Sequence, residues 1–121
     1  MNEFKIEQRE DGGISILHLN GYLDAHTAPH LEQALSKLVA DKKFSIVVNC
    51  NELTYISSAG LGVFMAYIED VRKNKGDIKM SNMNPKIYNV FDLLGFPLIY
   101  EIYSEEMEAL AKFRGTHSRK S

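Results

Sequence analysis

Two adjacent serines lie at the predicted start of a helix, where a hydroxyl group can cap the helix or accept a phosphate. Ser57 and Ser58 interrupt the stretch YISSAGLGVF, residues 55–64, just before Gly60 and Gly62. The apolar pattern after them is that of a helix, so free backbone N–H groups and the positive end of a helix dipole collect beside the serines. A serine here can cap the helix, or it can accept a phosphate, which the same N–H groups and dipole stabilise.

The phosphate interpretation predicts a switch on binding rather than catalysis. A phosphoserine carries about −1.5 to −2 charges at pH 7, and a helix N-terminus receives such a group without unfolding the domain. The added charge changes the exposed surface, so a partner that docks on an apolar or acidic neighbourhood is repelled. The local chemistry leaves capping and phosphate acceptance both open.

Known catalytic patterns do not fit this stretch. The hydrolase pattern Gly-x-Ser-x-Gly has Ile56 in place of its first glycine, and no P-loop lysine follows Gly62. His26 and His30 are four residues apart, but the sequence offers no third metal ligand nearby. We therefore predict a protein that is not an enzyme and that holds no cofactor and no metal.

Alternating apolar patterns indicate the elements that must position the serines. Period-two segments with a turn at 11–13 predict an N-terminal hairpin, and spacings of three and four predict helices. Strands are expected at 4–8, 14–19, 44–50, 78–83 and 98–103, and helices after Thr27, after the serine pair, from Asn84-Pro85 and after Ser104.

This order predicts an α/β fold in a single domain. Strands that alternate with helices form a mixed, mostly parallel sheet, here of about five strands with an N-terminal antiparallel hairpin, packed with about four α-helices. The domain is expected to span residues 1–113, and the polar residues 114–121 are expected to form a disordered tail.

Composition bounds the class of protein. The chain has 121 residues, of which 45% are hydrophobic, and a formal charge of −2, which argues against nonspecific nucleic-acid binding. Cys50 is the only cysteine, so no intrachain disulfide forms. The polar N-terminus does not have the pattern of a signal peptide, and no apolar run is long enough to cross a membrane. These features predict a cytoplasmic protein that binds neither nucleic acid nor membrane. A monomer or weak dimer is expected, although the sequence does not determine the oligomeric state.

Two motifs together resemble the STAS-domain family of anti-sigma factor antagonists. SSAGLGV resembles the family's phosphorylation motif, commonly Asp-Ser-Ser/Thr/Ala-Gly-Leu-Gly, and Ser58 takes the place of the phosphorylated serine. GYLDAHTAPHLEQAL, residues 21–35, resembles the family's Gly-x-Leu-Asp-x-x-Thr-Ala segment, with Asp24 and Thr27 in those places. Ser57 stands where the family often has Asp, which makes it a minor alternative acceptor. The resemblance covers residues 4–113.

The resemblance implies a mechanism of partner switching. The unphosphorylated protein would bind an anti-sigma factor serine kinase and so release a sigma factor. The kinase would phosphorylate Ser58 with its own ATP, and a PP2C-type phosphatase would restore the protein. The partner-binding surface is expected to include Asp24, Thr27, Asn49, Ser57, Ser58, Gly60, Leu61 and Gly62.

Three points stay open at this stage. Asn49, at the expected end of the central strand, is either a turn residue or part of this surface. The family also contains scaffold subunits of larger signalling complexes and modules that bind small ligands, so both remain alternatives. The sequence does not identify the kinase, the phosphatase, the sigma factor or the input signal.

Overall fold

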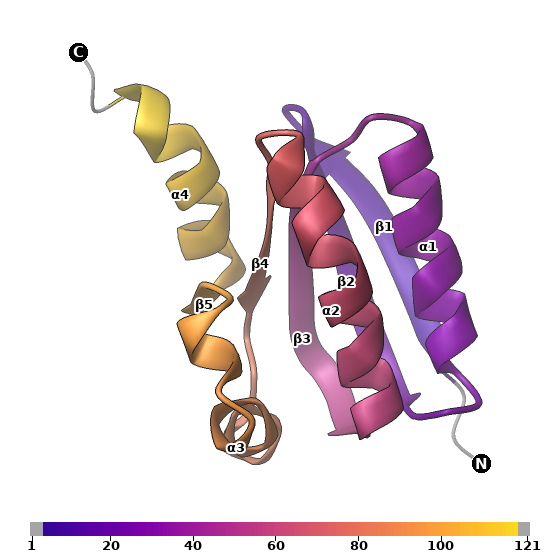
Figure 1. Cartoon of the computed structure of the whole chain (residues 1–121). Helices are drawn as coiled ribbons and strands as arrows, with labels where there is room; N and C mark the ends of the chain where they lie inside the picture. Colours follow the sequence, from indigo (N-terminus) through magenta and orange to yellow (C-terminus); the bar gives the residue numbers. More distant parts are fainter. Residues whose placement is uncertain (1–3, 119–121) are drawn as a thin grey trace.

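A five-stranded sheet with helices on both faces forms the domain (Figure 1). The computed structural model describes residues 4–118. Its elements are β1 (Lys5–Asp11), β2 (Ile14–Leu23), α1 (Ala28–Ala40), β3 (Ser45–Ile56), α2 (Ser58–Lys73), β4 (Asp77–Ser81), α3 (Pro85–Leu93), the short 3₁₀ helix η1 (Phe96–Leu98), β5 (Ile102–Tyr103) and α4 (Glu106–Ser118).

The strand order confirms the predicted sheet. It runs β1-β2-β3-β4-β5, with β1 and β2 antiparallel and the other neighbours parallel. The hairpin turn lies at Gly12 and Gly13, whose φ angles of 58° and 87° are left-handed and therefore suit glycine. Parallel pairing brings the carboxyl ends of β2 and β3 together, at the end of the sheet where α2 begins (Figure 1).

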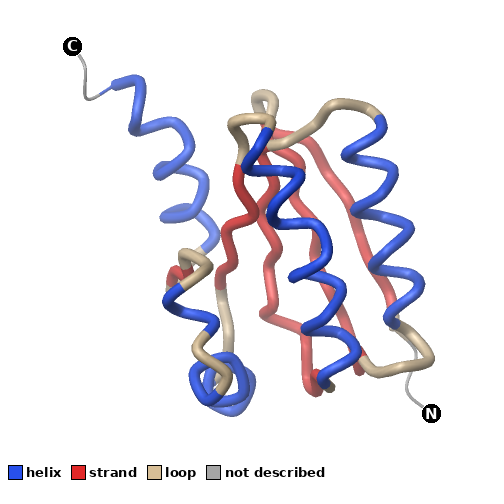
Figure 2. Tube along the Cα trace, in the orientation of Figure 1, coloured by secondary structure: helices blue, strands red, loops and turns tan. Residues whose placement is uncertain are grey.

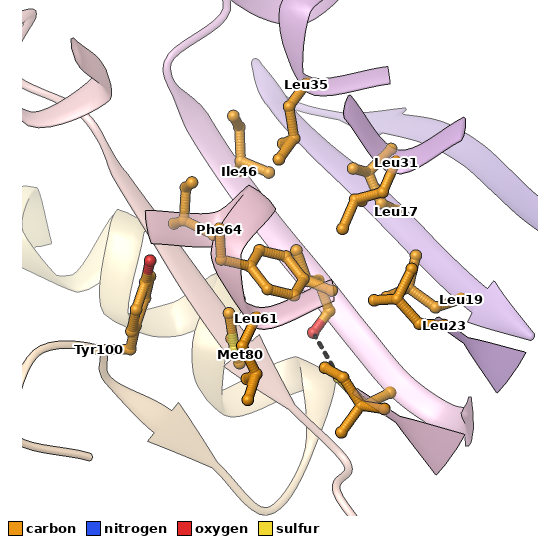
Figure 3. Close-up of a cluster of buried hydrophobic side chains, with 14 of the residues drawn as sticks. Leu17, Leu19, Leu23, Leu31, Leu35, Ile46, Leu61, Phe64, Met80 and Tyr100 are labelled. Carbon is orange, nitrogen blue, oxygen red and sulfur yellow. Dashed lines mark hydrogen bonds between the residues drawn. The ribbon is translucent and has the colours of Figure 1, made fainter. Parts of the chain in front are cut away.

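The larger core lies between the sheet and helices α1 and α2, which run side by side over one face (Figure 2). Phe64 is fully buried among the side chains of this core, between Tyr100 and Met80 on one side and the β2 leucines on the other (Figure 3). Leu31 and Leu35 of α1 enter the same cluster. This packing holds the first turn of α2 against the carboxyl end of the sheet.

A smaller core lies on the opposite face, under α4. Ile14 and Ile16 of β2 and Val47 of β3 pack there with Ala109 and Leu110 of α4. The sheet therefore has two unlike faces, one with an extended apolar cluster and one with a small apolar cluster.

The end of the chain differs from the sequence prediction at two places. The strand expected at 98–103 is only Ile102–Tyr103, because Gly95, with φ 77°, and Pro97 form the 3₁₀ helix η1, which contains Leu98. Helix α4 continues to Ser118, so it includes residues 114–118, which the sequence assigned to a tail. Arg114 explains part of this extension, since its guanidinium donates to Asp11 Oδ1 at 2.8 Å. Residues 119–121 of the expected tail lie outside the described residues.

Candidate functional site

The serine pair and the β2–α1 loop meet at the carboxyl ends of β2 and β3. The backbone N–H of Ser57 donates to the carbonyl of Leu23 at 2.9 Å. Asp24 follows Leu23, and Ser58 follows Ser57, so each lies one residue beyond this hydrogen bond. The structure therefore brings together the two motifs that are separated by more than thirty residues in the sequence.

The two serines differ in exposure. Ser57 occupies the N-cap position of α2 in extended conformation, with φ −106° and ψ 175°, and its side chain makes no capping hydrogen bond. Its Oγ atom is buried and has no hydrogen-bond partner among the described residues. Ser58 is the first residue of α2 and is exposed. The capping interpretation therefore does not describe Ser57, and Ser58 presents its hydroxyl at the positive end of the helix.

Gly60 and Gly62 have different surroundings although they are only two positions apart in α2. A Cβ atom added at Gly60 would lie 2.6 Å from Leu23 Cγ and 3.2 Å from Ile56 Cγ1. A Cβ atom added at Gly62 would meet nothing within 4 Å. Gly60 therefore allows close packing of the first turn of α2 on the sheet, whereas Gly62 leaves an open surface beside Ser58.

Leu61 does not belong to the accessible surface, in contrast to the sequence prediction. It is 3% exposed, because the spacing of Leu61, Phe64 and Ile68 turns all three toward the sheet. Gly60 is buried as well. Met65 of the same helix is 47% exposed. The exposed face of α2 nearest the serine is therefore Ser58, Gly62 and Met65, at spacings of four and three.

Asp24 organises the loop that precedes α1. Its Oδ1 atom accepts from the backbone N–H of His26 at 2.9 Å and of Thr27 at 3.2 Å. Burial works to raise the pKa of the Asp24 carboxyl, but these backbone donors outweigh it and hold the pKa below its usual range. Asp24 is therefore a fixed negative charge beside the serine site at neutral pH.

Thr27 has the expected N-cap position, but its hydroxyl serves the loop rather than the helix. Its Oγ1 atom accepts from the backbone N–H of Asp24 at 2.9 Å and donates to the carbonyl of Tyr22 at 2.8 Å. No side-chain capping bond to α1 forms. Thr27 thus ties the end of β2 to the start of α1.

Asn49 lies elsewhere, so its predicted place at this site is wrong. Strand β3 continues to Ile56, which leaves Asn49 in the interior of the strand and 6% exposed. Its Nδ2 atom donates to Glu106 Oε1 of α4 at 2.9 Å, and its Oδ1 atom accepts from the backbone N–H of Asn51 at 2.8 Å. Asn49 anchors α4, and it is also not the turn residue that the sequence suggested.

Two tyrosines border the site and were not singled out from the sequence. Tyr22 of β2 and Tyr55 of β3 are register partners, and their ring centroids are 5.3 Å apart. They are 38% and 46% exposed. The available signal was an aromatic residue next to each motif, two positions before Asp24 and three before Ser58.

Metal and membrane sites have no support in the described part of the chain. Within residues 4–118, no group of three His, Cys, Asp or Glu side chains is placed to hold a metal ion. Over the same residues, no helix has the length and apolar character needed to span a bilayer.

Comparison with known proteins identifies the fold and the family. The family model described as the STAS domain matches residues 5–109. A relative named anti-sigma F factor antagonist, from Paenibacillus polymyxa, is 27% identical over 109 residues, which are 89% of this chain and 93% of the relative.

Solved structures give the same result. The crystal structure of an anti-sigma factor antagonist from Mycobacterium paratuberculosis has a TM-score of 0.86 and 26% identity, and the match covers 93% of this chain and 95% of that one. The phosphorylated form of SpoIIAA, a Bacillus cell fate determinant, shares the fold with a TM-score of 0.70 at 20% identity, over 92% of this chain and 99% of that one.

Proposed function

This chain belongs to the STAS-domain family, and on that premise we propose that it is an anti-sigma factor antagonist switched by phosphorylation of Ser58. The observation that carries the proposal is the difference between the serines. Ser58 is exposed at the first position of α2, whereas the Oγ atom of Ser57 is buried. A kinase needs an accessible hydroxyl, so Ser58 is the acceptor.

The proposed partners follow the same logic. The unphosphorylated protein binds an anti-sigma factor that is also a serine kinase, and this binding releases a sigma factor. The kinase transfers the γ-phosphoryl group of ATP to Ser58 Oγ, with loss of the hydroxyl proton and release of ADP. A PP2C-type phosphatase removes the phosphate by hydrolysis. All of these steps are proposed for the cytoplasm.

The physical effect of the phosphate is local. It adds about −1.5 to −2 charges beside the carboxylate of Asp24, so the surface becomes strongly negative at one point. Backbone N–H groups at the start of α2 stabilise the phosphate, so the core under it need not change. SpoIIAA supports this step, since its unphosphorylated and phosphorylated forms both match the fold of this chain with a TM-score of 0.70. A loss of about 3 kcal/mol in binding lowers affinity roughly a hundredfold.

Phosphorylation by an anti-sigma factor serine kinase from the same organism tests the proposal. We expect one phosphate per chain on the wild type and on Ser57→Ala, and none on Ser58→Ala, as read by mass mapping of the modified peptide. Ser58→Ala should still bind the kinase. Ser58→Asp should bind at least tenfold more weakly, with an unchanged circular dichroism spectrum.

Full phosphorylation of Ser58→Ala would contradict the assignment of the acceptor. Equal binding of Ser58→Asp and the wild type would contradict the switch. A large particle with other subunits, or a small molecule that copurifies with the chain, would instead favour the scaffold or the ligand-binding alternative.

A further inference from the structure

An exposed aromatic pair stands at the same end of the sheet as Ser58. Tyr22 and Tyr55 lie on neighbouring parallel strands, with ring centroids 5.3 Å apart and an interplanar angle of 38°. We propose that these two rings are the anchor on which the anti-sigma factor docks. This inference rests on the proposed function and adds to it the residues that supply affinity.

The pair faces away from the larger core. Leu23 and Ile56, which follow the two tyrosines, are buried in the cluster under α1 and α2. Neighbouring residues of a strand point to opposite faces, so the tyrosines point to the face that α4 covers elsewhere. In the smaller core, α4 packs against Ile14, Ile16 and Val47, at or near the other end of these strands. The rings are therefore left accessible.

The tyrosine pair is close enough to Ser58 for one partner to cover both. Tyr55 precedes Ser58 by three positions, so their Cα atoms are at most about 10 Å apart. A typical stable interface covers about 800 Å² on each partner, which is a disc of roughly 16 Å radius. A partner that docks over the carboxyl ends of β2 and β3 can cover Ser58 with such a footprint and also reach Tyr55 and its neighbour Tyr22. The Thr27 hydroxyl, which donates to the Tyr22 carbonyl, fixes this tyrosine to the Asp24 loop.

The surface close to Ser58 offers few other anchors. Leu61 is buried and Gly62 has no side chain, so the first turns of α2 supply little apolar area before Met65. Tyrosine is enriched among the residues that dominate binding energy, because its ring buries a large area and its hydroxyl tolerates a wet rim. The matching partner surface is an apolar pocket for the two rings, with a cationic group at its rim for the Asp24 carboxylate.

In this arrangement the residues that supply binding affinity differ from the residue that switches binding off. The rings supply contact area in both states of the protein, while phosphate on Ser58 adds negative charge under the same footprint. A partner with a cation opposite Asp24 gains binding energy from that carboxylate. If the partner surface opposite Ser58 is apolar or acidic, the same partner loses binding energy when Ser58 is phosphorylated. Three further exposed leucines, Leu93, Leu94 and Leu98, lie on α3, at its C-cap and on η1, and no described hydrogen bond joins them to the Asp24 loop or to Ser58.

Binding of an anti-sigma factor serine kinase from the same organism to single variants tests the anchor. We expect Tyr22→Ala and Tyr55→Ala each to raise Kd at least tenfold by isothermal titration calorimetry, which is the effect of a hot-spot truncation. Tyr22→Phe and Tyr55→Phe keep the rings and should stay within threefold of the wild type. Tyr88→Ala is the matched control, because Tyr88 is exposed to the same 38% as Tyr22, and should change Kd less than twofold.

Two results would overturn the anchor. One is wild-type affinity in an alanine variant that has the wild-type circular dichroism spectrum. The other is an equal loss of affinity in Tyr88→Ala. If an alanine variant does not fold, tenfold weaker binding by the folded Phe variant at that position overturns the role of the ring. Ser58→Asp in the same titration keeps the two proposals apart. Loss of binding by Ser58→Asp with no loss by the tyrosine variants overturns only the anchor, and the reverse pattern overturns only the switch.

Discussion

The two faces of the sheet hold their helices by different means. Under α1 and α2 lies an extended apolar cluster with Phe64 fully buried in it. Under α4 the apolar cluster is small, and Glu106 adds a polar network in which its carboxylate accepts from Asn49 and pairs with Arg9 and His18. Dry packing does not depend on pH, whereas a carboxylate network does. The serine site is built on the first face, so its geometry should be the less sensitive of the two to pH and salt.

The largest expected effect on stability comes from making a cavity in the apolar core under α1 and α2. Phe64→Ala should lower the free energy of unfolding by about 3–5 kcal/mol, because it removes a fully buried ring and leaves a cavity. Urea denaturation followed by circular dichroism measures this loss. The control is the next residue, since Met65→Ala removes a side chain that is 47% exposed and should cost less than about 1 kcal/mol. Equal losses at the two positions would show that the helix is not packed as described.

The second prediction compares Gly60 with Gly62. Gly60→Ala should destabilise the protein by about 1–3 kcal/mol, because the new methyl group overlaps Leu23 and must push the first turn of α2 away from it. Gly62→Ala should be neutral or stabilise by up to about 1 kcal/mol, since alanine is the better helix former and has open space. Thermal unfolding of both variants measures the difference. A more stable Gly60→Ala protein would mean that the helix end has room to move.

The smallest expected effect concerns the α4 face and depends on pH. Burial works to raise the pKa of the Glu106 carboxyl, but donors from Asn49 and Arg9 outweigh it and lower the pKa. A lowered pKa in the folded state contributes stability above the ordinary value of about 4.5, and that contribution is lost as the pH falls through the folded-state pKa. Glu106→Gln, which cannot titrate, should therefore be less stable than the wild type at pH 7 and approach it as the pH falls below 4.5.

Urea denaturation between pH 3 and pH 7 measures the two curves. Asn49→Ala provides a comparison, because it removes one donor to Glu106. When Asn49 is alanine, the stability difference between proteins with Glu106 and with Gln at position 106 should vary less with pH than it does in the wild-type background, but it should still vary. A constant stability difference between the wild type and Glu106→Gln across this range would contradict a role for the carboxylate charge.

Most of the fold was predictable because the signals are local. The alternation of β1 and β2, the glycine turn between them and the helical stripe of Leu61, Phe64 and Ile68 gave the element types and their order, and the sheet follows from that order. The strand expected at 98–103 is present only at Ile102–Tyr103, because its apolar residues have a strand-like pattern while Gly95 and Pro97 set the backbone of the 3₁₀ helix that includes Leu98.

The candidate site was predictable only in part. The motifs around Asp24 and Ser58 were visible in the sequence, and the hydrogen bond from Ser57 to Leu23 joins them. Asn49 was misplaced because the length of β3 depends on its pairing with β2, which extends through Ile56. Leu61 was misplaced because a helix end next to a glycine suggests exposure, although the first turn of α2 packs closely on Leu23.

By itself, the sequence determined that a helix begins at the serine pair and that glycines follow it. Capping and periodicity are properties of a few neighbouring residues. Only the tertiary structure decided which of the two hydroxyls reaches solvent and which aromatic rings lie at the same end of the sheet. The reason is that the exposure of a side chain depends on which other parts of the chain pack against it. At Ser57 and Tyr55 that packing comes from β2, more than thirty residues earlier in the chain.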